Sequence, residues 1–302
     1  MPTESSPNDT LREKVALVTG ANTGIGLVTA RELARRGAHV FIACRSAEKA
    51  AAALEAAKTP GGGAIELLSL DLGDLASVRR CAAAFLARDL PLNLLVNNAG
   101  VAGARGRTAS GFELAFGVNH VGHFLLTTLL LDRIKQSTPA RIVTVASKAH
   151  ADTTGIPPWE KLRVRTRSIT GLPEYAVAKL ANVLFSAALA RRLADTGVTT
   201  YSLHPGVVAT DVWRSVPWPV RGLMKRAMIS PDEGAKTTLY CATAAETANQ
   251  TGLYYDACAV KQPSPAARDV AMGEALWRNS EAAVDDPTTA ATAAIAATTA
   301  IP

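Results

Sequence analysis

The stretch KVALVTGANTGIG, residues 14–26, decides the fold because it joins a short apolar strand to a glycine-rich turn and a helix. Gly20, Gly24 and Gly26 follow a Gly-x-x-x-Gly-x-Gly spacing, and helical periodicity continues over 27–36 until Gly37 ends it. Such a turn lets a phosphate approach the backbone, where the helix start offers unpaired N–H groups and a partial positive charge. The glycines alone are also compatible with an ordinary turn, and their place after the first strand of an alternating chain favours phosphate binding.

Short apolar runs alternate with helical stretches along the rest of the chain. We expect strands over 14–19, 39–43, 64–70, 92–96, 141–146 and 198–203, and helices over 27–36, 47–58, 75–87, much of 108–135, and 175–193. Continuously apolar strands between helices are typical of a parallel sheet that is covered on both faces. Right-handed crossovers then predict an α/β fold, a single-domain Rossmann-type doubly wound parallel β-sheet with helices on both faces.

The predicted domain limits follow from changes in amino-acid composition along the chain. The chain has 302 residues, of which 48% are hydrophobic and 19% charged, and this excludes a wholly disordered chain. We expect a flexible tail over 1–13 and one domain over 14–280. The segment 284–302 is almost entirely small and uncharged, rich in Ala and Thr, and is expected to be a low-complexity disordered tail. Two segments rich in Pro and Arg, 151–174 and 211–231, interrupt the alternation.

Several partner classes are disfavoured by the sequence. The four cysteines are widely spaced, which predicts free thiols in a reducing compartment rather than disulfides or zinc. His120 and His123 lack a recognisable third ligand, so no metal is expected. The compact apolar run 124–131 is too short to span a bilayer, and the first residues lack the features of a signal peptide, so we expect a cytoplasmic protein with no transmembrane segment. A net charge of +6 without a recognition motif argues against nucleic-acid binding.

The end of the second predicted strand bears on the cofactor that the glycine turn would hold. An acidic residue near this point accepts hydrogen bonds from an adenosine 2′-hydroxyl, but here Arg45 stands instead. A guanidinium suits a 2′-phosphate, so NADP(H) is the preferred cofactor, with NAD(H) as the alternative and a solvated Arg as the plainer interpretation. Asp71 is placed to meet the adenine amino group, unless it serves the start of the next helix, where Asp74 competes as the cap.

Four residues form a candidate catalytic set. Tyr175 and Lys179 lie four apart on a predicted helix, which places both on one face, and a nearby ammonium lowers the pKa of a phenol. Ser147 ends a strand at the edge where such a sheet binds its ligand, and Asn119 lies in an apolar helical stretch, where an unpaired amide is costly. Each also has an ordinary explanation: a chance spacing, a turn cap at Ser147, and a kink residue satisfied by backbone at Asn119.

Taken together, these motifs resemble those of the short-chain dehydrogenase/reductases. The matching pieces, across roughly 13–280, are TGANTGIG (19–26), NNAG (97–100), Asn119, Ser147, YAVAK (175–179) and HPGVVAT (204–210). The chain is most similar to the retinol dehydrogenase branch, through IACR (42–45), GVNHVGHFLLT (117–127), KLANVLFS (179–186) and TGVTTYSLHPGVV (196–208). The first residues show no apolar anchor such as membrane-bound members of that branch carry, which argues against a retinoid in particular.

The resemblance implies a role for each matching residue. Tyr175 is the implied general acid or base, and Ser147 holds the substrate oxygen. Lys179 lowers the pKa of Tyr175 and holds the nicotinamide ribose, and Asn119 anchors a water that links Lys179 to solvent. The residues implied to contact the cofactor are Gly20, Asn22, Thr23, Gly24, Ile25, Gly26, Arg45, Asp71, Leu72, Asn98, Ala99, Gly100, Tyr175, Lys179, Pro205, Gly206, Val208 and Thr210. The segment 211–231 is implied to close over the substrate as a lid.

We therefore expect an NADP(H)-dependent oxidoreductase that interconverts an alcohol and an aldehyde or ketone on a hydrophobic small molecule. One alternative is an NAD-dependent epimerase or dehydratase of the same family, which usually has a Gly-x-x-Gly-x-x-Gly turn and a longer C-terminal domain. The other is a catalytically silent nicotinamide-sensing protein, which usually lacks the Tyr/Lys pair. Family members often pair through the helices that contain Asn119 and Tyr175, so a homodimer or homotetramer is expected.

Overall fold

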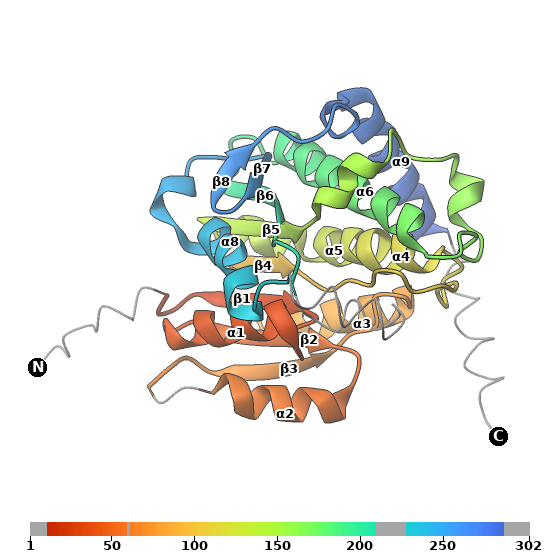
Figure 1. Cartoon of the computed structure of the whole chain (residues 1–302). Helices are drawn as coiled ribbons and strands as arrows, with labels where there is room; N and C mark the ends of the chain where they lie inside the picture. Colours follow the sequence, from red (N-terminus) through yellow and green to blue (C-terminus); the bar gives the residue numbers. More distant parts are fainter. Residues whose placement is uncertain (1–10, 59–60, 209–227, 287–302) are drawn as a thin grey trace, which may run out of the picture.

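The computed structural model describes residues 11–58, 61–208 and 228–286, which form an eight-stranded sheet between two layers of helices (Figure 1). The strands are β1 (Val15–Thr19), β2 (His39–Cys44), β3 (Ile65–Ser69), β4 (Leu94–Asn97), β5 (Ala140–Val145), β6 (Val198–His204), β7 (Leu253–Asp256) and β8 (Ala259–Lys261). Their order is β3-β2-β1-β4-β5-β6-β7-β8. The predicted doubly wound Rossmann-type sheet is confirmed, and its direction of winding reverses between β1 and β4.

The edge strand β8 departs from the predicted parallel sheet, because it runs antiparallel to β7. Only Ala257 and Cys258 separate the two strands, and both have positive φ angles, 50° and 59°. A two-residue connection of this kind can reverse the chain into a hairpin but cannot carry it across to a parallel neighbour. The other strand pairs are parallel.

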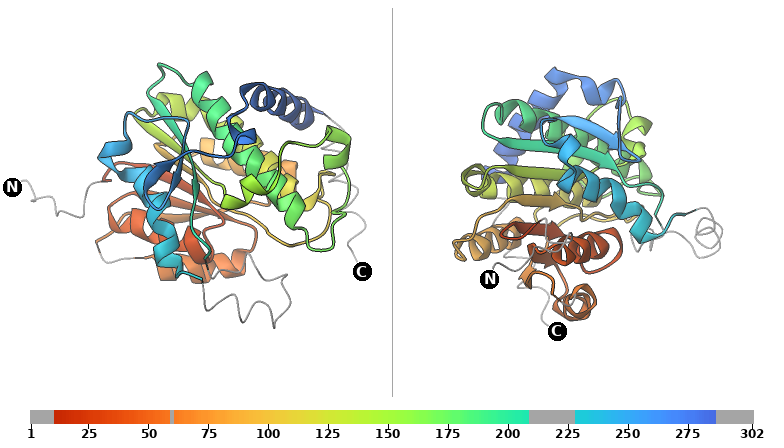
Figure 2. Two further views of the ribbon diagram at one scale, coloured as in Figure 1. Left: turned by 45° about the horizontal axis from the view of Figure 1, so that its top comes forward. Right: turned by 90° about the vertical axis from the view of Figure 1, so that its left-hand side faces the viewer.

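Helices cover both faces of the sheet (Figure 2). Those on one face are α1 (Gly24–Arg35), α2 (Ala47–Ala57) and α8 (Pro231–Thr243), and those on the other are α3 (Leu75–Leu86), α5 (Gly122–Gln136), α6 (Leu172–Arg192) and α9 (Val270–Asp285). Each layer encloses its own aliphatic core. Strand residues that alternate in sequence point to opposite cores: Leu17 packs on the α3/α5/α6 side, whereas Ala16 and Val18 pack on the α1/α8 side.

Two predicted helices differ in extent from those observed. The predicted helix 175–193 begins earlier, at Leu172, because Gly171 adopts a left-handed φ of 66° and Pro173 fits the first helical turn. The predicted stretch 108–135 divides into α4 (Leu114–Phe116), a π-helical turn (Gly117–Val121) and α5. The segments that form β7, β8, α8 and α9 were not predicted as strands or helices from the sequence.

The folded domain also extends beyond its predicted limits. Helix α9 continues to Asp285 with Val284 buried, so the predicted boundary at 280 falls inside a helix and the predicted tail begins too early. At the other end, Leu11 packs against the core and its N–H donates to the carbonyl of Arg36, so 11–13 belong to the fold. The rest of both predicted tails, and residues 209–227 of the predicted lid, lie outside the described residues.

Helix α9 lies along α6, the helix that contains Tyr175 (Figure 1). Its Trp277 stacks on Phe185 of α6 with ring centroids 5.8 Å apart, and the Arg192 guanidinium lies 4.0 Å from the centre of the same indole. One side of the helix expected to form a dimer contact is therefore covered by the chain itself. The segment Leu114–Gln136 is long and apolar enough to cross a membrane, but 72% of its most apolar window is buried inside the fold, as in a core helix.

Candidate active site

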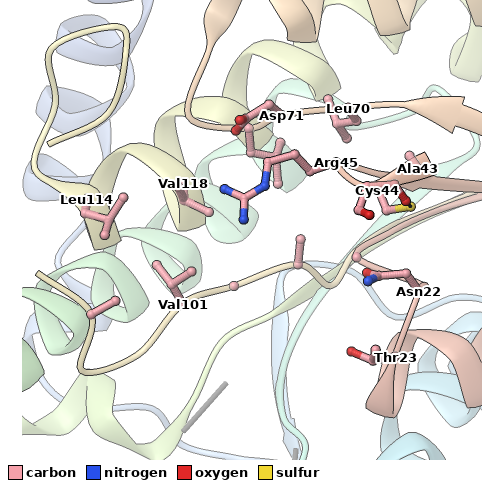
Figure 3. Close-up of a pocket in the computed structure, with 16 residues that line it drawn as sticks. Asn22, Thr23, Ala43, Cys44, Arg45, Leu70, Asp71, Val101, Leu114 and Val118 are labelled. Carbon is pink, nitrogen blue, oxygen red and sulfur yellow. Dashed lines mark hydrogen bonds between the residues drawn. The ribbon is translucent and has the colours of Figure 1, made fainter. Parts of the chain in front are cut away.

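Two adjoining cavities lie at the carboxyl ends of the central strands, and they share Gly20, Thr23 and Gly100. The first, of about 300 Å³, lies beyond β2 and β3. Arg45 extends its guanidinium into it from the end of β2, with Asp71 beside it and Asn22 on the opposite wall (Figure 3). The neighbouring helix α3 is capped by Asp74, whose carboxylate accepts from the N–H of Ala76 at 2.9 Å. Asp71 lines the cavity, and its Oδ1 also accepts from the N–H of Gly73 at 2.9 Å in the turn before α3.

The floor of this cavity is a backbone turn with no space for side chains. Gly20 has a φ of 66°, and a Cβ on it would lie 2.8 Å from Cα of Ala99. A Cβ on Gly26 would lie 2.5 Å from Nδ2 of Asn98. A second loop, which follows β4, lies against this turn. Thr19 holds it to β1, because the Thr19 hydroxyl oxygen accepts from the N–H groups of Asn98 and Ala99 at 2.9 and 3.0 Å. The backbone of both loops is therefore open to a bound phosphate group.

The second cavity, of about 510 Å³, holds three residues of the predicted catalytic set: Ser147, Tyr175 and Lys179. Ser147 follows β5, and Tyr175 and Lys179 lie one turn apart on α6. Burial raises the pKa of Tyr175, and a hydrogen bond with Ser147 partly opposes the rise. The phenol is therefore protonated at neutral pH and placed to donate a proton.

Lys179 is fully buried in the wall of this cavity. Its Nζ donates to the carbonyl of Val145 at 2.7 Å and lies 5.5 Å from the centre of the Tyr175 ring. Burial lowers the pKa of Lys179 to about 7. The prediction that Lys179 lowers the pKa of Tyr175 is not met in this structure, because desolvation of the phenol outweighs the opposing hydrogen bond and the pKa of Tyr175 moves upward.

Asn119 lies behind the cavity in the π-helical turn, where it fastens the loop after β4. Its Oδ1 accepts from the N–H of Val101 at 2.8 Å and its Nδ2 donates to the carbonyl of Val101 at 3.0 Å. The interpretation that backbone satisfies this amide is confirmed, and the water relay stays a prediction. Asn119 nevertheless lies near Lys179, because a Cβ on Gly100 would lie 3.2 Å from the Asn119 Oδ1 and 3.7 Å from the Lys179 Nζ.

The described chain places nearly all predicted cofactor residues around the two cavities. The first is lined by Gly20, Asn22, Thr23, Arg45, Asp71, Leu72, Ala99 and Gly100, and the second by Gly24, Ile25, Gly26, Asn98, Tyr175, Lys179, Pro205, Gly206 and Val208. Thr210 lies outside the described residues. A continuous surface thus runs from Arg45 along the glycine turn to Tyr175, as an extended dinucleotide requires.

Comparison with known proteins identifies the family of the chain. The short chain dehydrogenase family model matches residues 14–157. Retinol dehydrogenase 12 of Homo sapiens is 46% identical over 274 residues, which cover 89% of this chain and 86% of that protein. The Homo sapiens dehydrogenase/reductase SDR family member 13 is 44% identical, over 90% of this chain and 73% of its own length. The chain belongs to the short-chain dehydrogenase/reductases.

Solved structures show the same fold. The crystal structure of an uncharacterised protein from Mycobacterium paratuberculosis has a TM-score of 0.72 at 34% identity, covering 91% of this chain and 94% of that one. A single-residue variant of actinorhodin polyketide ketoreductase with NADPH has a TM-score of 0.63 at 28% identity, covering 83% of this chain and 96% of that one. Membership of this family implies that the dehydrogenase uses a nicotinamide cofactor, NAD(H) or NADP(H), and the cavity surface fits such a group.

Two buried histidines of this dehydrogenase have separate hydrogen-bond partners. Nε2 of His123 lies 2.8 Å from the Thr19 hydroxyl, and its Nδ1 donates to the carbonyl of Asn119 at 3.0 Å. Nε2 of His120 lies 3.0 Å from the hydroxyl of Ser280. Burial lowers the pKa of His120 to about 3 and that of His123 to about 4, so both rings are neutral.

Part of the second cavity wall is not predicted from the sequence. Lys148, Asp152, Leu172 and Val207 line it in addition to the predicted residues. Lys148 follows Ser147 directly, and Val207 lies within the HPGVVAT motif. Adjacency to these motifs was the only available signal, and the parallel pairing of β5 with β6 brings the segments that follow the two strands to one cavity.

Proposed function

We propose that this short-chain dehydrogenase/reductase is an NADP(H)-dependent enzyme that interconverts an alcohol and an aldehyde or ketone on a hydrophobic small molecule. The observation that carries the proposal is one cavity of about 510 Å³ that is lined by Ser147, Tyr175 and Lys179 together with the glycine turn. The wall around them is largely aliphatic, with Ile25, Leu172 and Val207 among its members. An apolar alcohol or carbonyl compound fits such a wall better than a charged metabolite does.

The chain's own residues supply a proton and orient the substrate oxygen. Ser147 Oγ accepts from the N–H of Ala149 at 3.2 Å, and its hydroxyl proton is the one that a substrate carbonyl would receive as a hydrogen bond. Tyr175, whose pKa is raised by burial, gives up its proton as the carbonyl oxygen gains negative charge. Lys179, whose pKa is lowered to about 7 by burial, is placed to pass a proton near neutral pH. The nicotinamide, held along Gly24, Pro205 and Gly206, would supply the hydride.

Arg45 supports NADP(H) over NAD(H). It is exposed at the end of β2 and reaches into the first cavity, where Asp71 is the one acidic residue among the described lining residues (Figure 3). A guanidinium pairs with the 2′-phosphate of NADP through charge-assisted hydrogen bonds. The ribose hydroxyls of NAD instead donate to a carboxylate, which an arginine does not provide. The related ketoreductase that was crystallised with NADPH accords with this preference.

Tyr175→Phe tests the proposed chemistry directly. We expect the rate of NADPH oxidation with a panel of apolar aldehydes and ketones to fall by about 10²- to 10⁴-fold, because the general acid is removed. Tyr240→Phe on α8, whose ring packs against Tyr255 away from both cavities, is the matched control and should keep the wild-type rate. A Tyr175→Phe variant that still reduces these compounds near the wild-type rate would contradict the mechanism.

Compartment is a separate part of the proposal. The four cysteines are free thiols, and three of them are buried. Free thiols of this kind persist in a reducing compartment. They support a cytoplasmic location for the enzyme.

A further inference from the structure

The turn that carries Ser147 is held by side chains as well as by its own backbone. The N–H of Ala149 donates to the Ser147 hydroxyl oxygen, and the N–H of His150 donates to the Ser147 carbonyl at 3.1 Å. The N–H of Lys148, directly after Ser147, donates outside the turn, to Nδ1 of His204 at 3.3 Å. Every N–H group of the three residues that follow Ser147 therefore has an acceptor.

His204 stands at the end of β6 and lines the second cavity, with only 5% of its surface exposed. Its Nδ1 accepts the N–H of Lys148, so a neutral ring carries its proton on Nε2. Burial lowers the pKa of His204 to about 4, with Asp256 opposing the fall and Lys148 and Lys179 adding to it. The ring is neutral at physiological pH, as its acceptor role requires.

His150 contacts the same turn through the carbonyl of Ser147. Its Nδ1 lies 2.7 Å from the Ser147 carbonyl, which can only accept, so Nδ1 carries the proton. Its Nε2 accepts the N–H of Ser264 at 3.0 Å, and its ring packs 4.9 Å from that of Tyr254. Burial lowers the pKa of His150 as well, with Asp152 opposing the fall. Only one neutral tautomer satisfies both nitrogens.

We propose that His204 and His150 are positioning residues that fix Ser147 for catalysis, one accepting from the peptide after Ser147 and the other donating to the Ser147 carbonyl. The proposal rests on the proposed function, because it concerns how the substrate-binding hydroxyl is held. The two rings enter from β6 and from within the turn itself, so together they fasten the turn to the sheet and to the segment at Ser264. The Ser147 hydroxyl then keeps one orientation toward the cavity, and a misplacement of about 1 Å at such a group costs up to about 10²-fold in rate.

The test compares two substitutions at His204 that differ in whether a δ atom can accept a hydrogen bond. His204→Asn keeps an acceptor at the δ position, whereas His204→Leu keeps the bulk and removes the acceptor. We expect His204→Leu to lower kcat by about 10- to 100-fold, with KM for NADPH unchanged, and His204→Asn to restore kcat close to wild type. His39→Leu is the matched control at an outlying strand end, where the ring stacks on Phe41, and should leave kcat unchanged.

Equal losses in His204→Leu and His204→Asn would overturn the acceptor role, and so would a rise in KM for NADPH without a fall in kcat. A second measurement does not depend on activity. Nitrogen-15 NMR of histidine-labelled wild-type protein at pH 7 should show His204 protonated on Nε2 and His150 on Nδ1. Reversed tautomers would overturn the proposal even if the enzyme is active. A wild type that reduces no carbonyl but shows the expected tautomers would instead contradict the proposed function alone.

Discussion

The two halves of the sheet build their parts of the site by different means. On the β1–β3 side the site is mostly backbone: a turn of glycines, closed by the loop after β4 and held by the Thr19 hydroxyl. On the β5–β7 side it is mostly buried polar side chains, of which Lys179 and Asn182 share the Val145 carbonyl at 2.7 and 3.3 Å. The geometry of a site made of backbone follows from the spacing of glycines in the sequence. The geometry of a site made of buried side chains depends on every helix and strand that packs around them.

If the β5–β7 side of the site depends on packing, the largest loss of stability should follow the removal of a buried residue that packs on α6 far from the cavity. Trp277→Ala removes an indole that is 6% exposed and contacts Phe124, Phe185 and Arg192. We expect a loss of about 3–5 kcal/mol in the free energy of unfolding, measured by urea denaturation. Val270→Ala on the same helix, at a side chain that is 56% exposed, is the control and should change stability by less than about 0.5 kcal/mol. Similar losses in both variants would contradict the packing role of α9.

Ser147→Ala should separate chemistry from cofactor binding. We expect kcat to fall by about 10²- to 10³-fold, as when one donor to a developing oxyanion is removed. KM for NADPH should stay near the wild-type value, since Ser147 lines only the second cavity. Thermal melting checks that the variant is folded. A large change in KM for NADPH with little change in kcat would contradict the separation of cofactor binding on the β1–β3 side from chemistry on the β5–β7 side.

Arg45→Ser tests the cofactor half by itself. We expect kcat/KM with NADPH to fall by about 10- to 100-fold, because a charge-assisted contact worth about 1.5–3 kcal/mol is lost, and kcat/KM with NADH to change little. Arg278→Ser, at an exposed position on α9, is the control for the general effect of losing a positive charge. Equal losses with both cofactors would argue against a 2′-phosphate contact.

The smallest expected effect is a pH dependence of stability from His204. The unfolded chain binds a proton here below about pH 6.5, whereas burial holds the folded pKa at about 4. Stability from this group is therefore complete above about pH 6.5 and is lost as the pH falls toward 4. Between about pH 5.5 and 4.5 the wild type should lose about 1 kcal/mol per pH unit relative to His204→Asn, measured by urea denaturation. Parallel pH profiles would contradict a buried neutral ring.

The sequence predicted the cofactor half better than the catalytic half. Gly20, Gly24, Gly26 and Arg45 lie where the alternation of strand and helix placed them, because each stands just after a strand or in the first turn of a helix. Glycine also adopts the positive φ angles of 66° at Gly20 and 58° at Gly24 that this turn requires. The sequence also located Ser147, Tyr175 and Lys179. It did not predict the direction in which the pKa of Tyr175 shifts, because this pKa rises where a fall was expected. Spacing reveals which charges can meet, and only the surrounding atoms reveal how strongly a group is desolvated.

By itself, then, the sequence determined the class of sheet, the position of the glycine turn and the candidate catalytic side chains, since these follow from local periodicity and short motifs. The tertiary structure alone decided that α9 covers α6 through Trp277, that Lys179 faces the Val145 carbonyl, and that His204 and His150 meet on either side of Ser147. Those contacts either join residues far apart in the chain, such as Lys148 and His204, which are 56 positions apart, or depend on side-chain orientation. Such contacts are set by how the layers pack, which no local pattern in the chain records.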